Sequence, residues 1–248
     1  FYRIDNVYNE VKKIDNLAFS SGTVVIRSAG NRRKESVTPE KRTPYVLTVG
    51  AATSTGDQVA PYSDYGVEPP FWIIKPEVVA PGTYEFRGKY WRGTSYAAPY
   101  VSGSAALIKQ LHPTASPDEI KSLLATTSTI IKNRDPEALF SQGSGRINLY
   151  KAVTTQTIIS PPSLSFKLEN GQKAEEFLTI KNNSPDMQTY KLNWVINDAG
   201  IIGEISEPIL VIPAKAEKVV TISLHTTVNG TFEGQISIIS DYEVCHLP

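Results

Sequence analysis

The hydrophobic pattern changes character near Val153. Before that residue, apolar runs rich in Val and Ile alternate with stretches whose apolar residues recur every three or four positions. The runs at residues 23–31, 45–53 and 76–82 predict buried strands that lead into loops, and the spaced pattern at residues 7–19 predicts a helix. Strands that alternate with helices are typical of a mostly parallel α/β sheet.

Two further helices are indicated by the residues at their starts. The Ala-rich run that begins in GTSYAAPYVSG (residues 93–103) predicts a buried helix starting near Ser95. Pro99 lies within about one turn of that start, where its missing N–H costs no helical hydrogen bond. In SPDEIKSLLATTS (residues 116–128), a Ser is followed by Pro and, three positions on, by Glu119. This capping-box arrangement predicts another helix start.

Beyond Val153, strict alternation of apolar and polar residues takes over. A linker-like stretch at residues 154–162 ends in Pro-Pro, and the turn sequences NNSPD, NDAG and VNG separate the alternating runs that follow. Several short alternating strands predict an antiparallel β-sandwich of immunoglobulin or fibronectin-III type over residues 163–248. The residues expected to share buried faces are Leu178 and Ile180; Tyr190, Leu192, Trp194 and Ile196; Val220, Ile222 and Leu224; Ile236 and Ile238.

Composition narrows the function classes. The chain has 248 residues, enough for two domains, and its 25 basic residues balance its 25 acidic ones. Balanced charge gives no reason to expect a nucleic-acid partner, and no apolar stretch approaches the ~20 residues that span a bilayer. The one cysteine, Cys245, excludes an internal disulfide and is expected to be a buried small hydrophobic residue. Because the only methionine is Met187 and the chain starts at Phe1, we expect part of a longer polypeptide.

Ser95 is the first candidate for chemistry. At the start of a helix, free N–H groups and the positive end of the helix dipole favour nearby negative charge. A serine in that position could cap the helix, or it could attack a carbonyl carbon beside a ready-made oxyanion site. The residues around Ser95 alone do not decide between the two.

Four segments together resemble one family. GTSYAAPYVSG (93–103) is similar to the G-T-S-x-A-x-P-x-V-x-G pattern around the nucleophile of subtilisin-like serine proteases (subtilases). SAGN (28–31) resembles that family's oxyanion-hole loop, and KPEVVAPG (75–82) resembles the stretch leading into the nucleophile loop. QGSGRINLYKAV (142–153) resembles the segment that closes the catalytic domain. The order and spacing match, and the resemblance covers residues 1–153.

The resemblance implies a serine endopeptidase that acts on proteins or peptides, with the C-terminal portion of a subtilisin-like catalytic domain. Ser95 would be the nucleophile, and its backbone N–H would form the oxyanion hole with the side-chain amide of Asn31. Thr94 would support that amide from behind. Ser28, Ala29 and Gly30 would line one wall of the pocket for the residue before the scissile bond.

The base is the missing element. A subtilase uses Asp, His and Ser in that chain order, and in the family the Asp and His precede the oxyanion loop. His112 would lie about 25 Å along the helix from Ser95, and His225 and His246 fall in the predicted β-sandwich. We therefore expect an incomplete active site, inactive without an N-terminal portion of the same protease packed against it.

A second reading is a catalytically dead, subtilase-like surface protein whose β-sandwich mediates binding or assembly. The joint presence of Ser95, Thr94 and Asn31 counts against this reading, since a site that no longer catalyses a reaction does not require these residues. The resemblance also implies an extracellular or cell-surface location, with weak support from glycosylation triplets at Asn182 and Asn229. No cofactor is expected. Structural calcium is common in the family, but no acidic cluster here has convincing ligand spacing.

Two neighbouring groups are expected to be structural. Residues 32–35 (RRKE) read as a solvated loop, although their closeness to Asn31 leaves room for a preference for acidic residues on the leaving-group side. The aromatic residues that flank Ser95 read as packing residues rather than substrate contacts. These are Tyr84, Tyr90, Trp91 and Tyr96.

Overall fold

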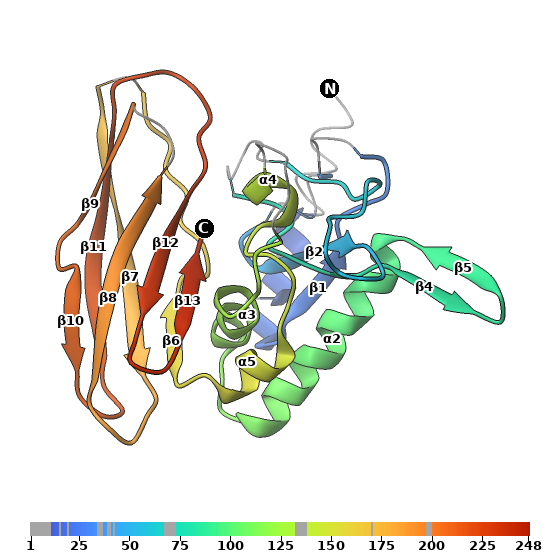
Figure 1. The fold of residues 1–248 in the computed structure, drawn as a ribbon, viewed down its shortest axis with the longest axis horizontal. Coiled ribbons are helices and arrows are strands. Elements are labelled where there is room, and N and C mark those ends of the chain that lie inside the picture. Colours follow the sequence, from blue (N-terminus) through green and yellow to red (C-terminus); the bar gives the residue numbers. More distant parts are fainter. Residues whose placement is uncertain are drawn as a thin grey trace.

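The computed structural model describes residues 11–14, 16–18, 20–33, 37–38, 41, 43–66, 73–131, 138–169, 171–196 and 200–248. Figure 1 shows two regions side by side, one with helices around a small parallel sheet and one built of antiparallel strands. The helix predicted over 7–19 lies partly outside the described residues, and the described positions between 11 and 21 are helical.

A three-stranded parallel sheet forms the centre of the first region. Its strands are β1 (Val25–Ser28), β2 (Val46–Ala52) and β3 (Val78–Pro81), in the order β1-β2-β3. Every residue of β2 is buried, which explains why its sequence is a continuous apolar run without alternation. Strand β1 is half-buried rather than buried as predicted, because it has only one neighbour among the described strands.

The helices that follow β3 in the described part of the chain are α2 (Thr94–Leu111), α3 (Pro117–Thr126), α4 (Ala138–Gln142) and α5 (Leu149–Thr154). Helix α2 buries one stripe of its surface against the sheet, and the members of that stripe include Ala97, Val101, Ala105 and Ile108. The capping box of α3 is confirmed, since the Glu119 N–H donates to Ser116 Oγ and the Ser116 N–H donates to Glu119 Oε2.

The prediction for Pro99 is wrong. Helix α2 begins at Thr94 after the N-cap Gly93, so Pro99 lies in its second turn. A residue there would normally donate its N–H to the carbonyl four positions earlier, which belongs to Ser95. Pro99 therefore removes a helical hydrogen bond from Ser95 itself.

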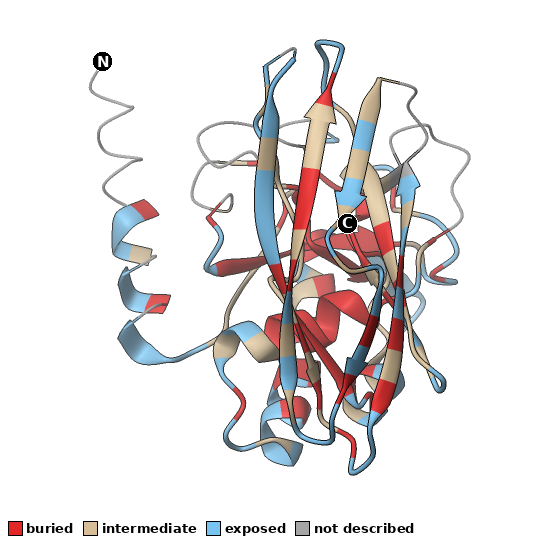
Figure 2. Ribbon diagram, turned by 90° about the vertical axis from the view of Figure 1, so that its left-hand side faces the viewer, coloured by how far each residue is buried: buried red, intermediate tan, exposed pale blue. Residues whose placement is uncertain are grey.

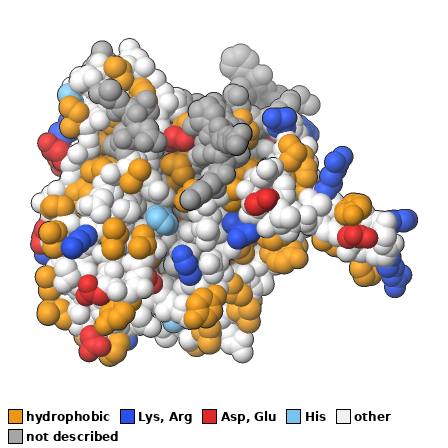
Figure 3. Space-filling model, viewed as in Figure 1, with side chains coloured by type: hydrophobic (Ala, Val, Ile, Leu, Met, Phe, Trp, Pro, Cys, Tyr) orange, Lys and Arg blue, Asp and Glu red, His pale blue; other side chains and the backbone are white. Residues whose placement is uncertain are grey.

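An unpredicted hairpin joins β3 to α2. Strands β4 (Thr83–Phe86) and β5 (Lys89–Arg92) pair antiparallel around a two-residue turn, in which Arg87 and Gly88 have φ of 52° and 69°. Positive φ at both positions suits the twist of a tight hairpin. The hairpin projects from the molecule in Figure 1, and Figure 3 shows hydrophobic and charged side chains gathered on it.

The second region contains two four-stranded antiparallel sheets. One has the order β6-β7-β11-β9 and the other the order β10-β8-β12-β13. The strand bounds are β6 Thr157–Ser160, β7 Lys173–Asn182, β8 Gln188–Ile196, β9 Ile201–Ile205, β10 Ile209–Ile212, β11 Glu217–Thr226, β12 Gly234–Ile239 and β13 Val244–Leu247. Strand β6 lies inside the stretch 154–162, which was predicted to be a linker. Residues Thr157–Ser160 pair with the end of β7, so this part of the stretch belongs to a sheet.

Both sheets contribute to one buried cluster, and the antiparallel strands in Figure 2 carry red, buried positions between exposed ones. It contains Leu178, Ile180, Val220 and Ile222 from one sheet and Tyr190, Leu192, Ile236 and Ile238 from the other. The predicted alternation is therefore right at these positions. Trp194 is half-buried and packs against the cluster. Cys245 is buried in it as expected, and burial raises the pKa of its thiol to about 12.

Helix α3 connects the two regions. It packs against β6 and β13, and its Ser122 hydroxyl donates to the carbonyl of Ile159. Lys181 of β7 forms an ion pair with Glu119 at the start of α3, with 2.8 Å between Nζ and Oε1. Among the helices that the structure describes, none is long and apolar enough to cross a membrane.

Candidate active site

Ser95 is the second residue of α2. The N-cap is Gly93, which makes no side-chain capping bond, so Ser95 does not cap the helix. Its side chain is exposed, and within the described part of the chain neither its hydroxyl nor its backbone N–H has a hydrogen-bond partner. Both groups lie at the helix end where free N–H groups favour negative charge.

Asn31 reaches the same helix start from the loop after β1. Its amide oxygen accepts two hydrogen bonds from Thr94, one from the backbone N–H (2.8 Å) and one from the hydroxyl (3.1 Å). A backbone N–H can only donate, so the side-chain atom facing it must be the oxygen. Asn31 Nδ2 is thereby left without an acceptor among the described residues.

Thr94 links the two segments. It is fully buried, and its hydroxyl also accepts a hydrogen bond of 3.1 Å from the N–H of Gly30. One residue therefore fixes both the orientation of the Asn31 amide and the position of the loop, across a sequence separation of 63 residues. Ser28 ends β1 and is half-buried, whereas Ala29 is fully buried and donates its N–H to Val49 of β2.

Two glycines make room at this junction. Gly30 has a φ of 132°, and a Cβ there would lie 2.1 Å from Asp64 Oδ2. Gly93 has a φ of 152°, and a Cβ there would lie 3.3 Å from Asn31 Nδ2. Any other residue would combine an unfavourable backbone conformation with a side chain pressed against a polar group of the site.

Two supporting residues were missed by the sequence analysis. Asp64 is buried, accepts the N–H of Arg32 on Oδ1 (2.6 Å) and donates its own N–H to the carbonyl of Gly30 (3.0 Å). The Tyr62 hydroxyl donates to the carbonyl of Gly82 (2.7 Å) and accepts the N–H of Gly93 (3.1 Å). The only sequence signal was the run PYSDYG, which mixes aromatic and polar residues between two predicted strands.

A buried ion pair holds the stretch that leads into the hairpin. Lys75 is fully buried and contacts Glu77 through its ammonium group, which also donates to the carbonyls of Thr43 (2.9 Å) and Val46 (2.8 Å). Glu77 Oε2 accepts the N–H of Thr48 at 2.7 Å. Burial raises the pKa of the Glu77 carboxyl, and the neighbouring Lys75 ammonium opposes that shift.

The aromatic residues beside Ser95 contact one another. The ring of Tyr96 lies edge-on to the rings of Tyr84 and Trp91, with centroids 5.1 Å and 6.3 Å apart. Tyr90 is 76% exposed on the outer strand of the hairpin. Arg32, at the start of the predicted solvated loop, is exposed, whereas Lys34 and Glu35 lie outside the described residues.

None of the three histidines lies near Ser95. His112 follows the last residue of α2, about 25 Å along the helix, and His225 and His246 lie in β11 and β13. The described residues contain no group of three or more His, Cys, Asp or Glu that could hold a metal ion.

Asn182 does not fit a glycosylation site. It is fully buried, and its Nδ2 donates to the carbonyls of Asp186, Ile212 and Pro213. Its amide nitrogen is thus enclosed within the antiparallel sheets. Asn229, the other triplet, is exposed.

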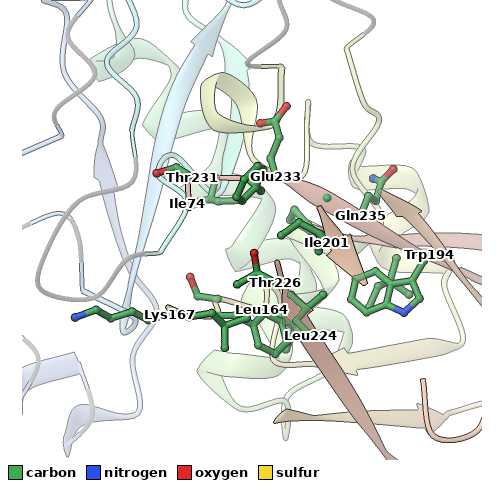
Figure 4. A pocket seen from close by; sticks show the side chains of 18 of the residues that line it. Ile74, Leu164, Lys167, Trp194, Ile201, Leu224, Thr226, Thr231, Glu233 and Gln235 are labelled. Atoms are coloured by element: carbon green, nitrogen blue, oxygen red, sulfur yellow. The ribbon is translucent and has the colours of Figure 1, made fainter. Parts of the chain in front are cut away.

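A mainly apolar cavity of about 360 Å³ lies elsewhere, at one end of the antiparallel sheets. Figure 4 shows side chains that line it, including Trp194, Leu224 and Gln235, together with Ile74 from the first region. Apolar cavities are common ligand sites, but none of the predicted site residues lines this one.

Comparisons with known proteins show the family of this chain. The subtilase family profile matches residues 3–145. The chain is 33% identical over 223 residues to the minor extracellular protease Vpr of Bacillus subtilis (strain 168), covering 80% of this chain and 27% of Vpr. It is 36% identical over 152 residues to subtilisin NAT of Bacillus subtilis subsp. natto, covering 57% of this chain and 36% of that protein.

Among solved structures, the prenylagaramide maturation protease PagA aligns with a TM-score of 0.47 and 27% identity, covering 57% of this chain and 54% of PagA. The chain spans about a quarter to a third of the length of the two Bacillus relatives. More than half of it matches the family profile, and the matched residues include the Asn31 loop and the start of α2. The chain belongs to the subtilase family.

Proposed function

We propose that this chain carries the nucleophile and the oxyanion hole of a serine endopeptidase. The Ser95 hydroxyl attacks the carbonyl carbon of a peptide bond, and the resulting oxyanion accepts hydrogen bonds from the Ser95 N–H and from Asn31 Nδ2. The observation that carries this proposal is the pair of hydrogen bonds from Thr94 to Asn31 Oδ1, which leaves Nδ2 free beside the exposed Ser95. Such preorganised donors stabilise charge that develops in the transition state.

The neighbouring residues take supporting roles. Thr94 is a positioning residue, because it acts on the oxyanion only through Asn31. Ser28, Ala29 and Gly30 form one wall of the pocket for the residue before the scissile bond. Ala29 is fully buried, so its contribution to that wall would come mainly from its backbone.

The general base is proposed to come from an N-terminal portion of the same protease. Support comes from the positions of the three histidines, of which one ends α2 and two lie in the antiparallel sheets. The preceding portion would supply the His, with an Asp to orient it, and would pack beside β1. Without a base, a serine hydroxyl at its ordinary pKa is a poor nucleophile.

The antiparallel region is proposed to be an immunoglobulin-like or fibronectin-III-like β-sandwich attached to the catalytic portion. The order of strands within each sheet supports this proposal. In one sheet, β6, β7, β11 and β9 lie side by side as strands A, B, E and D do in an immunoglobulin domain. In the other sheet, β8, β12 and β13 lie side by side as strands C, F and G do. Trp194 on β8 occupies the strand that carries the core tryptophan of immunoglobulin domains. The proposed units are residues 1–153 and 163–248 around the stretch 154–162, with β6 joining the sheets.

An extracellular or cell-surface location is part of the proposal. Support comes from the relative Vpr, whose name describes an extracellular protease. Proteins or peptides would be the substrates.

A fluorophosphonate probe tests the proposal directly, because it labels a serine only where a base activates it. Labelling of the protein isolated from its source, followed by peptide mapping, should place the probe on Ser95. The Ser95→Ala variant should lose labelling, whereas Ser102→Ala, which removes an exposed serine from the same helix, should keep it. If protein shown to contain the N-terminal portion remains unlabelled, the alternative holds: a catalytically dead surface protein that binds through its antiparallel sheets.

A further inference from the structure

A second cavity, of about 570 Å³, lies at the end of the molecule where α5 meets the antiparallel sheets. Figure 1 shows α5, the start of β8 and the turn between β12 and β13 at this same end, away from the start of α2. All residues lining this cavity, here called the end pocket, belong to the described chain, and nearly all are polar or aromatic. Its volume is in the range of small-molecule sites.

One residue that lines the end pocket has an unpaired acceptor. Gln188 is only 4% exposed, and its buried Oε1 has no hydrogen-bond donor among the described residues. Its Nε2 lies 3.4 Å from Ser184 Oγ, and the single hydroxyl hydrogen of Ser184 is directed to Asn182 Oδ1 or to the Asp186 carbonyl. Ser184 can therefore only accept from Gln188, which identifies the oxygen as the unpaired atom. A buried amide oxygen is normally satisfied by a donor.

Other residues that line the end pocket add further hydrogen-bond acceptors. Glu243 Oε1 accepts the hydroxyl of Thr157 (2.6 Å) and the N–H of Gln156 (3.2 Å), whereas its Oε2 has no donor among the described residues. Asp241 contributes an exposed carboxylate, and Lys151 contributes one ammonium group. Acceptors thus outnumber cations, so a well-matched ligand would bring several hydrogen-bond donors.

Two tyrosines complete the end pocket. Tyr150 on α5 is 76% exposed and Tyr242 in the β12–β13 turn is 81% exposed, and both line the cavity. A tyrosine ring presents an apolar face and a polar tip. The residues that line the end pocket therefore combine exposed aromatic rings with hydrogen-bond acceptors.

We propose that the end pocket binds a neutral saccharide. A sugar ring has an apolar C–H face, which would stack on Tyr150 or Tyr242, and hydroxyl groups at its edge, which would donate to Gln188 Oε1 and Glu243 Oε2. This binding function is separate from peptide hydrolysis at Ser95. It would hold the protease on a carbohydrate-bearing surface or substrate while the active site remains unaltered.

Ligand-observed NMR and titration calorimetry test the proposal on the intact protein. The probes are three neutral trisaccharides: cellotriose, maltotriose and the β-1,4-linked trimer of N-acetylglucosamine. At least one should bind, and Tyr242→Ala, a change in an exposed turn, should weaken that binding about ten-fold or more. Gln188→Leu should also weaken it, because it removes the buried acceptor.

Tyr100→Ala is the matched control, since it removes a tyrosine that is 52% exposed on α2 and outside the end pocket. It should leave saccharide binding unchanged, and all three variants should keep the fluorophosphonate labelling of the parent protein. Absence of binding by all three trisaccharides, or binding that survives Tyr242→Ala intact, would overturn the proposal. So would a crystal structure in which Gln188 Oε1 holds only an ordered water while saccharide binds elsewhere, or binding of a neutral peptide in place of every saccharide.

Discussion

The two regions of the molecule treat buried polar groups differently. The α/β region buries Lys75, Glu77, Asp64 and Thr94, and uses their hydrogen bonds to hold loops and strand ends. The antiparallel sheets bury mainly aliphatic side chains in a shared cluster, and their buried polar residues, such as Asn182 and Gln188, are uncharged. The first arrangement fixes the geometry of particular atoms, and the second supplies stability through the removal of apolar surface from water.

This difference follows the function proposed for each region. Asn31 must present one amide nitrogen in one direction, and only a directional contact such as that from Thr94 can enforce it. Hydrophobic contacts are non-directional, so they hold a sheet together but do not orient an amide. Mutations in the α/β region should therefore separate stability from activity more clearly than mutations in the sheets.

The largest expected effect comes from the buried ion pair. Glu77→Gln removes the carboxylate charge that contacts the fully buried Lys75 ammonium, and breaking such a buried pair costs about 3–5 kcal/mol of unfolding free energy. Denaturant unfolding measures the change. The control is Glu204→Gln in the antiparallel sheets, which removes one of the two carboxylate partners of an exposed Lys173 and should leave stability unchanged. Equal effects of the two substitutions would show that burial does not distinguish the two pairs.

The next effect should appear in catalysis rather than in stability, and it rests on the proposed function. Asn31→Asp keeps an oxygen for the two hydrogen bonds from Thr94 but removes the Nδ2 donor. Loss of one oxyanion-hole donor, as known for subtilisin, lowers kcat about 10²–10³-fold. Steady-state kinetics of the active protease should show that loss with a nearly unchanged melting temperature.

Thr94→Ser is the matched control for that experiment, because it keeps the hydroxyl that contacts Asn31. It should retain most of the activity, whereas Thr94→Val should lower kcat with little change in KM. If Asn31→Asp hydrolyses peptides at the parent rate, Nδ2 is not an oxyanion donor, whatever its orientation in the structure.

The features that could be predicted from the sequence are those that leave a periodic or a local pattern. Strand β2 and the alternating residues of β7 and β11 were predictable because burial on two faces or on one face leaves a distinct apolar period. The capping box at Ser116 was predictable because it is local, with all its partners within three residues.

Contacts between distant residues were not predictable from periodicity. Nothing local shows that Lys75 is buried, because its partners include carbonyls 29 and 32 residues earlier. The hairpin β4–β5 was not predicted because its turn is Arg87–Gly88 rather than the usual Asn-Gly or Asp-Gly. The candidate residues Ser95, Asn31 and Thr94 came from family resemblance, whereas the roles of Tyr62 and Asp64 needed the structure.

A smaller effect tests whether helix α3 is stabilised mainly by its own N-terminal cap or by its ion pair with the antiparallel sheets. Ser116→Ala removes the side-chain cap of α3 and should cost about 1 kcal/mol of unfolding free energy. Glu119→Gln keeps a capping-box residue but removes the ion pair with Lys181 of β7, and should cost less than that. Chemical unfolding of both variants decides the question, and a larger loss for Glu119→Gln would place the main support of α3 in its contact with the sheets.

The smallest effect concerns His246 in β13, one of the two half-buried histidines of the sheets. Burial lowers its pKa from the ordinary 6.5, and the nearby charge of Lys151 lowers it further. The folded protein therefore holds the neutral imidazole while the unfolded chain takes up a proton, so the unfolding free energy should fall as pH drops below about 6.5. Denaturant unfolding at several pH values should show a shallower decline for His246→Gln than for the parent protein. A decline that persists in full in His246→Gln would show that the burial of His246 does not cause it.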